Sequence, residues 1–468
     1  MKRLALTRAA PALALGLLAA AAPLAAQSVR IHSTTTMRYV ELRPILFNAD
    51  SGRYDPQAVQ AAAPVTQDFE VNAWGLGVNG LRAYGLLRFR GSLGSELVWP
   101  RYGDHFDALA AYLEYEHADY RLRLGRQQKA SALGWYGFDG LDAAWRPLSR
   151  VRVEGYAGRG LARGYDEPFN SKALAALDPF RPEKGTYLLG ATLVAAPSAT
   201  STFSAIYQRE ILQGGAGIVS ERVAVDGSAV LERFVTLAAS ADFDLATNEV
   251  GKARGTATFQ FGRALMLRGE VFRYRPTLDL TTIWGVFGPQ SHWGYTGTLQ
   301  ITPSRAFALW GSYTQRQYLP IDTVSPLVMA LPDREQDVAA GARIHLGPVQ
   351  LDGTYRYQME YGGDQSGGDA SLALVPSRDW RVGVKATAFQ NDGEFRVSNG
   401  TVYGVGFDAA VRLADRFEIR ADAMRFMQRK QERLQALTGL DWNQTRATVS
   451  LEWTFGVGAN PDRQGGTR

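Results

Sequence analysis

Charged side chains that face one another across a short hairpin are the groups in this sequence best placed to do chemistry. A tight turn at Ala118-Asp119 sets Glu116 opposite Arg121 and Glu114 opposite Arg123. Acid/base pairs at this spacing stabilise neighbouring strands by modest attraction. Ion pairing is therefore the chemistry expected here, and an ordinary electrostatic ladder is favoured over a catalytic or ligand-binding site.

Residues that commonly carry catalysis or bind metal are few and scattered. No pair of histidines has a His-Glu-x-x-His or similar ligand spacing, no Ser/His set converges, and the Gly-rich stretch 214–217 lacks a following Lys-Ser/Thr. The chain contains 0 Cys, which excludes disulfides, thiolate metal sites and covalent c-type haem. We expect no enzyme and no cofactor. The five histidines are His32, His105, His117, His292 and His345.

The first 26 residues have the pattern of a secretory signal peptide. Lys2, Arg3 and Arg8 precede an Ala/Leu-rich stretch, and small residues end it at Ala26. The apolar stretch is too short for a membrane-spanning helix. Its removal lowers the formal net charge from +5 to +2, so the basic balance of the full chain gives no indication of a nucleic-acid partner.

Most of the remaining chain alternates apolar and polar residues with a period of two, the signature of strands with one apolar and one polar face. Segment 447–455 places Ala, Val, Leu, Trp and Phe on one face and Thr, Ser and Glu on the other. The same alternation occurs in segments 349–361, 380–387 and 416–423. These segments therefore predict membrane-spanning strands of about ten residues.

Turn signals divide the chain into about 22 such strands, within a range of about 18–24, and short and long connections alternate. This pattern predicts an all-β fold, a transmembrane antiparallel up-and-down barrel with short periplasmic turns and longer extracellular loops. A soluble β-sandwich is the alternative, but its outer face would be charged. The expected organisation is a signal peptide at 1–26, a bacterial outer-membrane barrel at 27–456 and a polar tail at 457–468, with outer-membrane lipid as its surroundings.

A barrel of this width is normally plugged, yet the first predicted strand, 29–42, follows directly after the cleavage site. We therefore expect inward-folded loops or a separate protein to narrow the lumen. Loop 159–184, with a short helix at 172–177, is the best internal candidate, and a plain surface loop is an equally good interpretation. A second short helix is predicted from Asp55-Pro56 to Ala63.

The polar face of the predicted strands would line the lumen, and basic residues outnumber acidic ones on it. Rings of Arg and Lys favour anionic solutes, so a modest anion preference is expected. The candidate lumen-lining residues are Arg82, Arg88, Arg90, Glu114, Glu116, Arg121, Arg123, Arg126, Arg268, Arg356, Arg381 and Arg420.

Two segments resemble known outer-membrane proteins. The strand 448–455 resembles the terminal signal that barrel-assembly machinery recognises, although a polar tail follows its final Phe455. The Gly-Arg-Gln at 125–127 and the Phe-Asp-Gly at 138–140 resemble elements of porin-like barrels of the alginate-export type. That resemblance implies a channel for an anionic solute or polysaccharide, with Arg126 at its constriction.

Two functions are compatible with these features. The first is a porin-like channel for small or polymeric solutes, which the Arg-rich lumen and the Gly-Arg-Gln element favour. The second is a barrel sheath that houses a periplasmic multihaem cytochrome for electron transfer across the outer membrane, which the large strand number and the missing plug favour. The channel is the preferred hypothesis.

Overall fold

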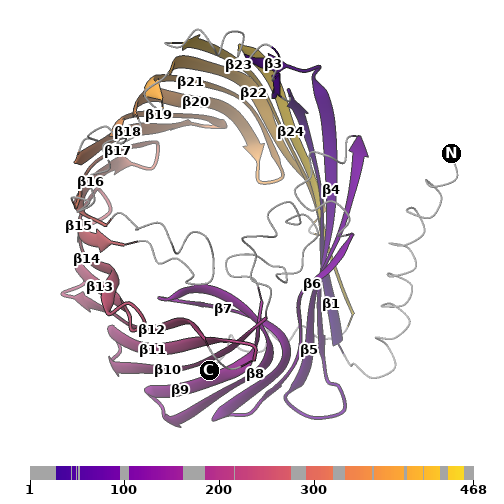
Figure 1. Ribbon diagram of the computed structural model, residues 1–468, viewed down its shortest axis with the longest axis vertical. Helices are drawn as coiled ribbons and strands as arrows, with labels where there is room; N and C mark the ends of the chain where they lie inside the picture. The colour runs from indigo at the N-terminus through magenta and orange to yellow at the C-terminus, as the bar shows by residue number, and fades with distance from the viewer. Residues whose placement is uncertain are drawn as a thin grey trace, which may run out of the picture.

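The computed structural model describes residues 28–43, 45–48, 50, 53–94, 105–161, 185–214, 217–275, 291–319, 333–360, 363–394, 398–414, 416–432 and 441–457. These residues form an antiparallel β-barrel around a wide lumen (Figure 1). The expected signal peptide, the expected helix at 172–177 and the tail from residue 458 lie outside the described residues. Within the described part of the chain, no helix has the length and apolarity that crossing a bilayer requires.

The strands of the barrel wall are long and follow one another along the chain. They are β1 (Ser28–Leu42), β4 (Gln60–Trp74), β5 (Leu81–Gly94), β6 (Phe106–Glu116), β7 (Tyr120–Ser131), β8 (Gly134–Leu148), β9 (Val151–Gly160), β10 (Thr186–Ser198), β11 (Ser201–Leu212), β12 (Ile218–Leu231), β13 (Val235–Asp244), β14 (Glu249–Phe261), β15 (Leu265–Tyr274), β16 (His292–Ser304), β17 (Phe307–Tyr318), β18 (Arg334–Leu346), β19 (Val349–Glu360), β20 (Gly363–Ser377), β21 (Trp380–Glu394), β22 (Ser398–Ala414), β23 (Phe417–Glu432) and β24 (Trp442–Val457). A separate small hairpin consists of β2 (Ile45–Asn48) and β3 (Arg53–Pro56).

The first strand closes the barrel. β1 pairs antiparallel with β24 on one side and with β4 on the other, and β9 pairs with β10. The main sheet thus contains 22 strands with no open edge. The prediction of an all-β antiparallel barrel of about 22 strands is confirmed.

The two faces of the wall differ as the alternation predicts. Val382 and Val384 on β21 are 51% and 56% exposed, and similar apolar side chains cover the outer surface of the other strands. On either side of these valines, Arg381 and Lys385 lie on the opposite face and pair with the acidic residues Asp408 and Asp422 on β22 and β23. An apolar outer face and a charged inner face are typical of barrels that are surrounded by lipid.

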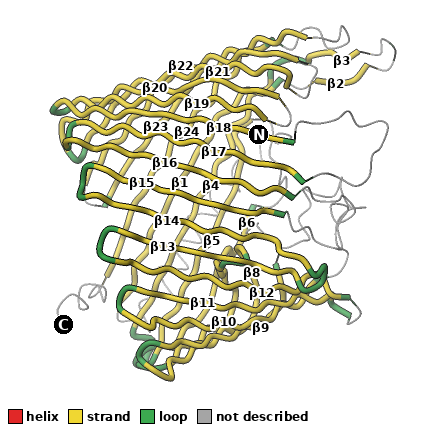
Figure 2. Tube along the Cα trace, turned by 90° about the vertical axis from the view of Figure 1, so that its left-hand side faces the viewer, coloured by secondary structure: helices red, strands yellow, loops and turns green. Residues whose placement is uncertain are grey.

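The strands cross the wall obliquely (Figure 2), and one end of the barrel has only short connections among the described residues, whereas the other has both long and short ones. The end with the short connections, called the turn end below, includes the turns at 117–119, 149–150, 199–200, 305–306, 347–348 and 378–379. The other end of the barrel, the loop end, is where the described strands stop before and resume after the long connections 95–105, 161–185, 275–291, 319–333 and 433–441. This alternation agrees with the sequence prediction.

The helix predicted from Asp55 to Ala63 is wrong. Strands occupy most of this segment instead: β3 ends at Pro56 and β4 begins at Gln60. β4 pairs with β1 from Leu42↔Gln60 onward. Hydrogen bonds to β1 outweigh the weak helix preference of the alanines in this segment.

Candidate functional site

The hairpin formed by β7 and β8 leaves the barrel wall at its loop end. β7 pairs with β6 only as far as Ala111↔Arg126, whereas its pairing with β8 continues to Ser131↔Gly134. On the other side, β8 pairs with β9 only from Phe138↔Gly160 onward. The backbone of residues 127–136, called the hairpin tip below, therefore pairs with neither β6 nor β9, and the hairpin curves into the lumen (Figure 1).

Two glycines permit this departure from the wall. Gly125 has a φ of +133°, and a Cβ atom there would lie 2.3 Å from the carbonyl oxygen of Ala111. A Cβ atom at Gly140 would lie 2.1 Å from the carbonyl oxygen of Ala157. Both positions accept only glycine without a backbone shift. They are the glycines of the Gly-Arg-Gln and Phe-Asp-Gly elements, so these elements mark the root of the hairpin tip.

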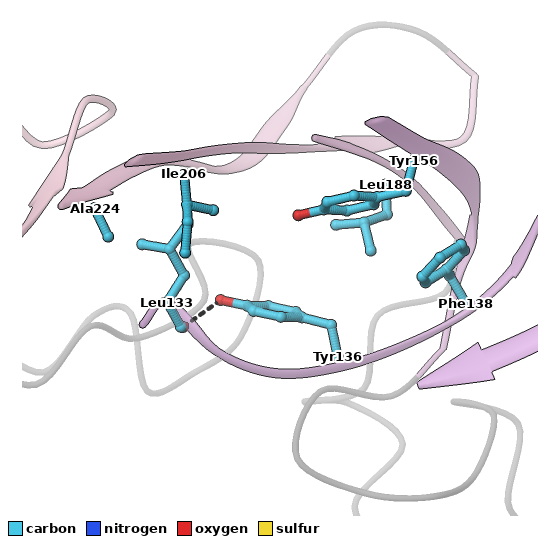
Figure 3. Close-up of a cluster of buried hydrophobic side chains, with 7 residues drawn as sticks. All are labelled: Leu133, Tyr136, Phe138, Tyr156, Leu188, Ile206 and Ala224. Atoms are coloured by element: carbon cyan, nitrogen blue, oxygen red, sulfur yellow. Dashed lines mark hydrogen bonds between the residues drawn. The ribbon is translucent and has the colours of Figure 1, made fainter. Parts of the chain in front are cut away.

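The hairpin tip packs against the inner face of the wall. Leu133 and Tyr136 of the tip form one buried cluster with Phe138 at its root and with a residue from each of the next four strands (Figure 3), namely Tyr156, Leu188, Ile206 and Ala224. The neighbours of these wall residues, such as Val153, Leu189 and Val225, are exposed on the outer face. The cluster is therefore inside the barrel, and the hairpin tip covers β9 to β12.

A buried ion pair on the wall holds the end of the hairpin tip. Arg222 Nη2 lies 2.6 Å from Asp242 Oδ2, and the side chains are only 5% and 2% exposed. Arg222 Nη1 donates a hydrogen bond to the Leu133 carbonyl oxygen at 3.0 Å, and it lies 3.3 Å from the Tyr136 hydroxyl. The Tyr136 hydroxyl donates to the same carbonyl at 2.6 Å. The carbonyl of the turn thereby gains two buried donors.

Asp242 is itself fixed by a distortion of the wall. The register between β13 and β14 shifts between Ala241 and Phe243, and the Lys252 amide donates to Asp242 Oδ1 at 2.7 Å. The carboxylate thus replaces a backbone acceptor at a β-bulge, a feature that re-aims a side chain. Asp242 is therefore held in position by a contact that does not involve the hairpin tip.

A second group of charges fastens the sides of the hairpin tip. Lys129 Nζ lies 3.2 Å from Asp142 and also contacts Glu154, and it sits 4.2 Å from the centre of the Tyr156 ring. Arg121 joins the same two acids at 2.9 and 3.3 Å. Two bases and two acids balance one another here, so this network adds cohesion without adding net charge.

Arg126, the residue that the family resemblance places at a constriction, lies at the root of the hairpin tip. Its Nε and Nη2 contact the two carboxylate oxygens of Asp139 at 2.7 and 2.9 Å. Its Nη1 donates to the Ala108 carbonyl oxygen at 3.0 Å and lies 3.8 Å from Asp107. Arg126 thus bridges the departing hairpin to β6 at the point where β6 and β7 separate.

The predicted ladder on β6 and β7 has the expected register, with Glu114 opposite Arg123 and Glu116 opposite Arg121. Glu114, which is 0% exposed, contacts both Arg82 and Arg123. Arg121 turns instead to Asp142 and Glu154. The structure therefore brings Arg82, Glu114 and Arg123 together as one three-residue group that spans β5 to β7.

The other candidate residues are spread around the wall, each beside an acid. Arg88 contacts Asp68 at 2.8 Å, and Arg90 lies 3.6 Å from Asp107. On the far side, the arginine–acid pairs are Arg268–Glu270 at 3.1 Å, Arg356–Asp337 at 3.9 Å, Arg381–Asp408 at 2.9 Å and Arg420–Glu418 at 2.6 Å. The sequence predicted that bases and acids share this face, but it did not predict most of the individual pairs, because these depend on the register between strands.

In these pairs the base is generally the more exposed partner. Arg254 and Arg268 share Glu270, and their side chains are 59% and 46% exposed against 12% for the acid. Arg412 and Arg420 share Glu418 in the same way, with 46% and 56% against 19%. The longer arginine side chain extends beyond the shorter acid. A solute beside the wall therefore meets guanidinium groups first.

The histidines do not gather at one place. His32 bonds to Thr454 on the neighbouring strand, His117 stacks on Tyr120, and His292 lies among aromatic rings between β15 and β17. Among the described residues, no group of three or more His, Asp or Glu side chains could hold a metal ion.

Together these features define a 22-stranded transmembrane β-barrel whose lumen contains an inward-folded hairpin. No known family and no curated protein matches the sequence. The fold is similar to two solved structures from Pseudomonas aeruginosa, the ferric enterobactin receptor PfeA and the siderophore receptor PirA. The TM-scores are 0.54 and 0.52 at 9% and 10% identity, with 91% of this chain covered in both and 81% and 80% of those chains. The likeness establishes the outer-membrane barrel fold.

Proposed function

We propose that this protein is a channel of the bacterial outer membrane that passes small or polymeric solutes and prefers anions. The barrel fold and the apolar outer face support a place in the membrane. The charged inner face supports a water-filled lumen, because arginine side chains that are about half exposed, such as Arg254 and Arg420, would be costly to place in a medium without water.

The observation that carries the anion preference is the unequal exposure of the inner ion pairs. In the groups Arg254–Glu270–Arg268 and Arg412–Glu418–Arg420, two guanidinium groups flank one shielded carboxylate. A passing ion interacts most with the charges nearest to it, because screening in water weakens the rest within about 10 Å. The inner surface therefore acts as a positive surface, although most of its bases are paired.

The alternative that the sequence left open, a sheath around a multihaem cytochrome, has less support. A sheath needs a clear lumen along its whole length, whereas the hairpin tip occupies part of the lumen and is fixed there by buried contacts. A hairpin of this kind suits a channel whose bore is narrower than its wall.

The test is single-channel recording with the full-length gene product, purified from outer membranes and reconstituted in a planar bilayer. We expect stable conductance steps and a reversal potential in a salt gradient that indicates anion preference. A reversal potential on the cation side would contradict the preference, and a folded barrel without conductance would contradict the channel. Very large unselective currents would instead support a barrel that lacks its lumen partner.

A further inference from the structure

We infer that the bore of the channel is set by the hairpin tip and that Arg222 and Asp242 are the positioning residues that hold it in place. This inference rests on the proposed channel function and adds which residues determine the size of the passage. Three features support it: the tip has left the wall, it lies on the inner face, and its outermost turn is bound by one buried pair.

The hairpin tip needs contacts beyond its own two strands. Between residues 127 and 136 its two strands pair through the backbone only with each other. An isolated two-stranded hairpin is marginally stable in water. The position of the tip in the lumen therefore depends on side-chain contacts with β9 to β12 and not on the sheet.

Arg222 makes the contact that lies farthest from the root. The ion pairs of Lys129 and Arg126 lie near the root, where the tip is still close to its own strands. Arg222 on β12 is separated from β8 by three strands, and it binds the Leu133 carbonyl at the very end of the turn. A contact at the turn restricts the movement of the hairpin tip more than contacts at its root do. Arg222 therefore controls the position of the tip.

The burial of Arg222 depends on both Asp242 and the hairpin tip. A guanidinium group that is 5% exposed requires a partner, since unpaired buried charge is strongly unfavourable. Asp242 supplies that partner, and the bulge between β13 and β14 aims it inward. Arg222 is buried only while the hairpin tip covers it, because it lies on the lumen face of β12. The pair and the tip therefore stabilise each other's position.

The experiment compares R222M with R209M in bilayer recordings. Arg209 is a matched control: it lies on β11 beside Arg222's strand, pairs with Glu221 at 4.0 Å and belongs to the outer face. We expect R222M to conduct at least twice as much as the parent, or to switch between the parent level and a larger one. R209M is expected to keep the parent level. Equal conductance of R222M and the parent would overturn the inference.

A thiol readout tests the position of the tip without relying on conductance. The chain has 0 Cys, so a single L133C substitution gives a unique label site. Leu133 is 4% exposed, and maleimide should react slowly in the L133C variant and at least tenfold faster when R222M is added. Equal labelling rates in the two backgrounds would overturn the inference even if no variant conducts.

A chemical cross-link between the hairpin tip and the wall tests whether the position of the tip sets the conductance. Leu133 and Ala224 belong to the same buried cluster, so a short bismaleimide between L133C and A224C should hold the tip on the wall. Cross-linking is expected to return the R222M background to the parent conductance. A cross-linked protein that keeps the enlarged conductance would show that the tip does not set the bore. If the parent barrel does not conduct and the R222M barrel does, the proposal that the parent is an open channel is wrong. The inference that the tip sets the bore would then still be supported.

Discussion

Arg126 and Asp139 form a two-pronged ion pair across the β7–β8 hairpin, with Nε–Oδ1 and Nη2–Oδ2 distances of 2.7 and 2.9 Å. The pair joins the Gly-Arg-Gln element of β7 to the Phe-Asp-Gly element of β8. It also lies directly at the last β6–β7 pairing, Ala111↔Arg126. Its role is therefore to secure the root of an inward-folded hairpin, and the guanidinium group is shared with a carboxylate and a backbone carbonyl.

The first prediction concerns the strength of this pair. In a double-mutant cycle with R126A and D139A, the coupling free energy should be about 1 kcal/mol, because the geometry is good but the 40% exposure of Asp139 lets water screen it. Urea unfolding in lipid vesicles measures the four free energies of unfolding. Additive single-mutant effects would mean that the pair contributes nothing to the root.

The second prediction concerns the glycines of the root. Gly125→Ala and Gly140→Ala should each destabilise the barrel by about 1–3 kcal/mol or prevent assembly, since each new Cβ would meet a backbone oxygen. Gly85→Ala on β5 is the control, because nothing lies within 4 Å of a Cβ there. Heat-modifiable migration of outer-membrane samples on gels reports folding. Normal folding of both root variants would contradict the proposed bend.

The fold could be predicted well from the sequence because its main determinant is local. Period-two alternation and turn residues are visible in the order of residues, and lipid permits a closed barrel as the only strand-based solution. Strands such as those at 349–361, 380–387, 416–423 and 447–455 could therefore be predicted without any knowledge of long-range contacts. Even the register of Glu114 and Arg123 followed, since a short turn joins their strands.

The site was predicted less well because it depends on contacts between distant strands. Leu133 and Arg222 are 89 residues apart, and no local pattern links them. The sequence offered loop 159–184 as a candidate for narrowing the lumen, and residues 162–184 lie outside the described residues, so that prediction stays untested. The β7–β8 hairpin, which the described structure places inside the lumen, was not predicted. One local signal was present: Gly125 in the Gly-Arg-Gln element and Gly140 in the Phe-Asp-Gly element. The family resemblance directed attention to Arg126 in the first element, and the bend at the two glycines was not predicted.

The third prediction concerns charge selectivity. Replacing both Arg254 and Arg268 with glutamine leaves Glu270 exposed to the lumen, so the anion-to-cation permeability ratio should fall, by roughly twofold. E270Q should raise the ratio, because it removes the shielded negative charge. The reversal potential in a salt gradient measures both. R209Q, on the outer face, should leave the ratio unchanged, and a shift as large as that of the double variant would show that lumen exposure is not the cause.

The fourth prediction concerns which face of the wall contacts lipid, and it compares two adjacent residues of β16. Leu299 is 41% exposed on the outer face, and Thr298 lies on the inner face opposite Arg268. Leu299→Glu places a charge in hydrocarbon and should destabilise the barrel by about 2 kcal/mol. Acidic residues on the lipid face generally cost less than Arg or Lys, for which the cost at the bilayer midplane is about 2–4 kcal/mol. Thr298→Glu places the same charge beside a guanidinium group in the lumen and should leave the free energy of unfolding within about 0.5 kcal/mol of the parent. Urea unfolding in vesicles distinguishes the two, and equal effects of both substitutions would be incompatible with lipid on one face and water on the other.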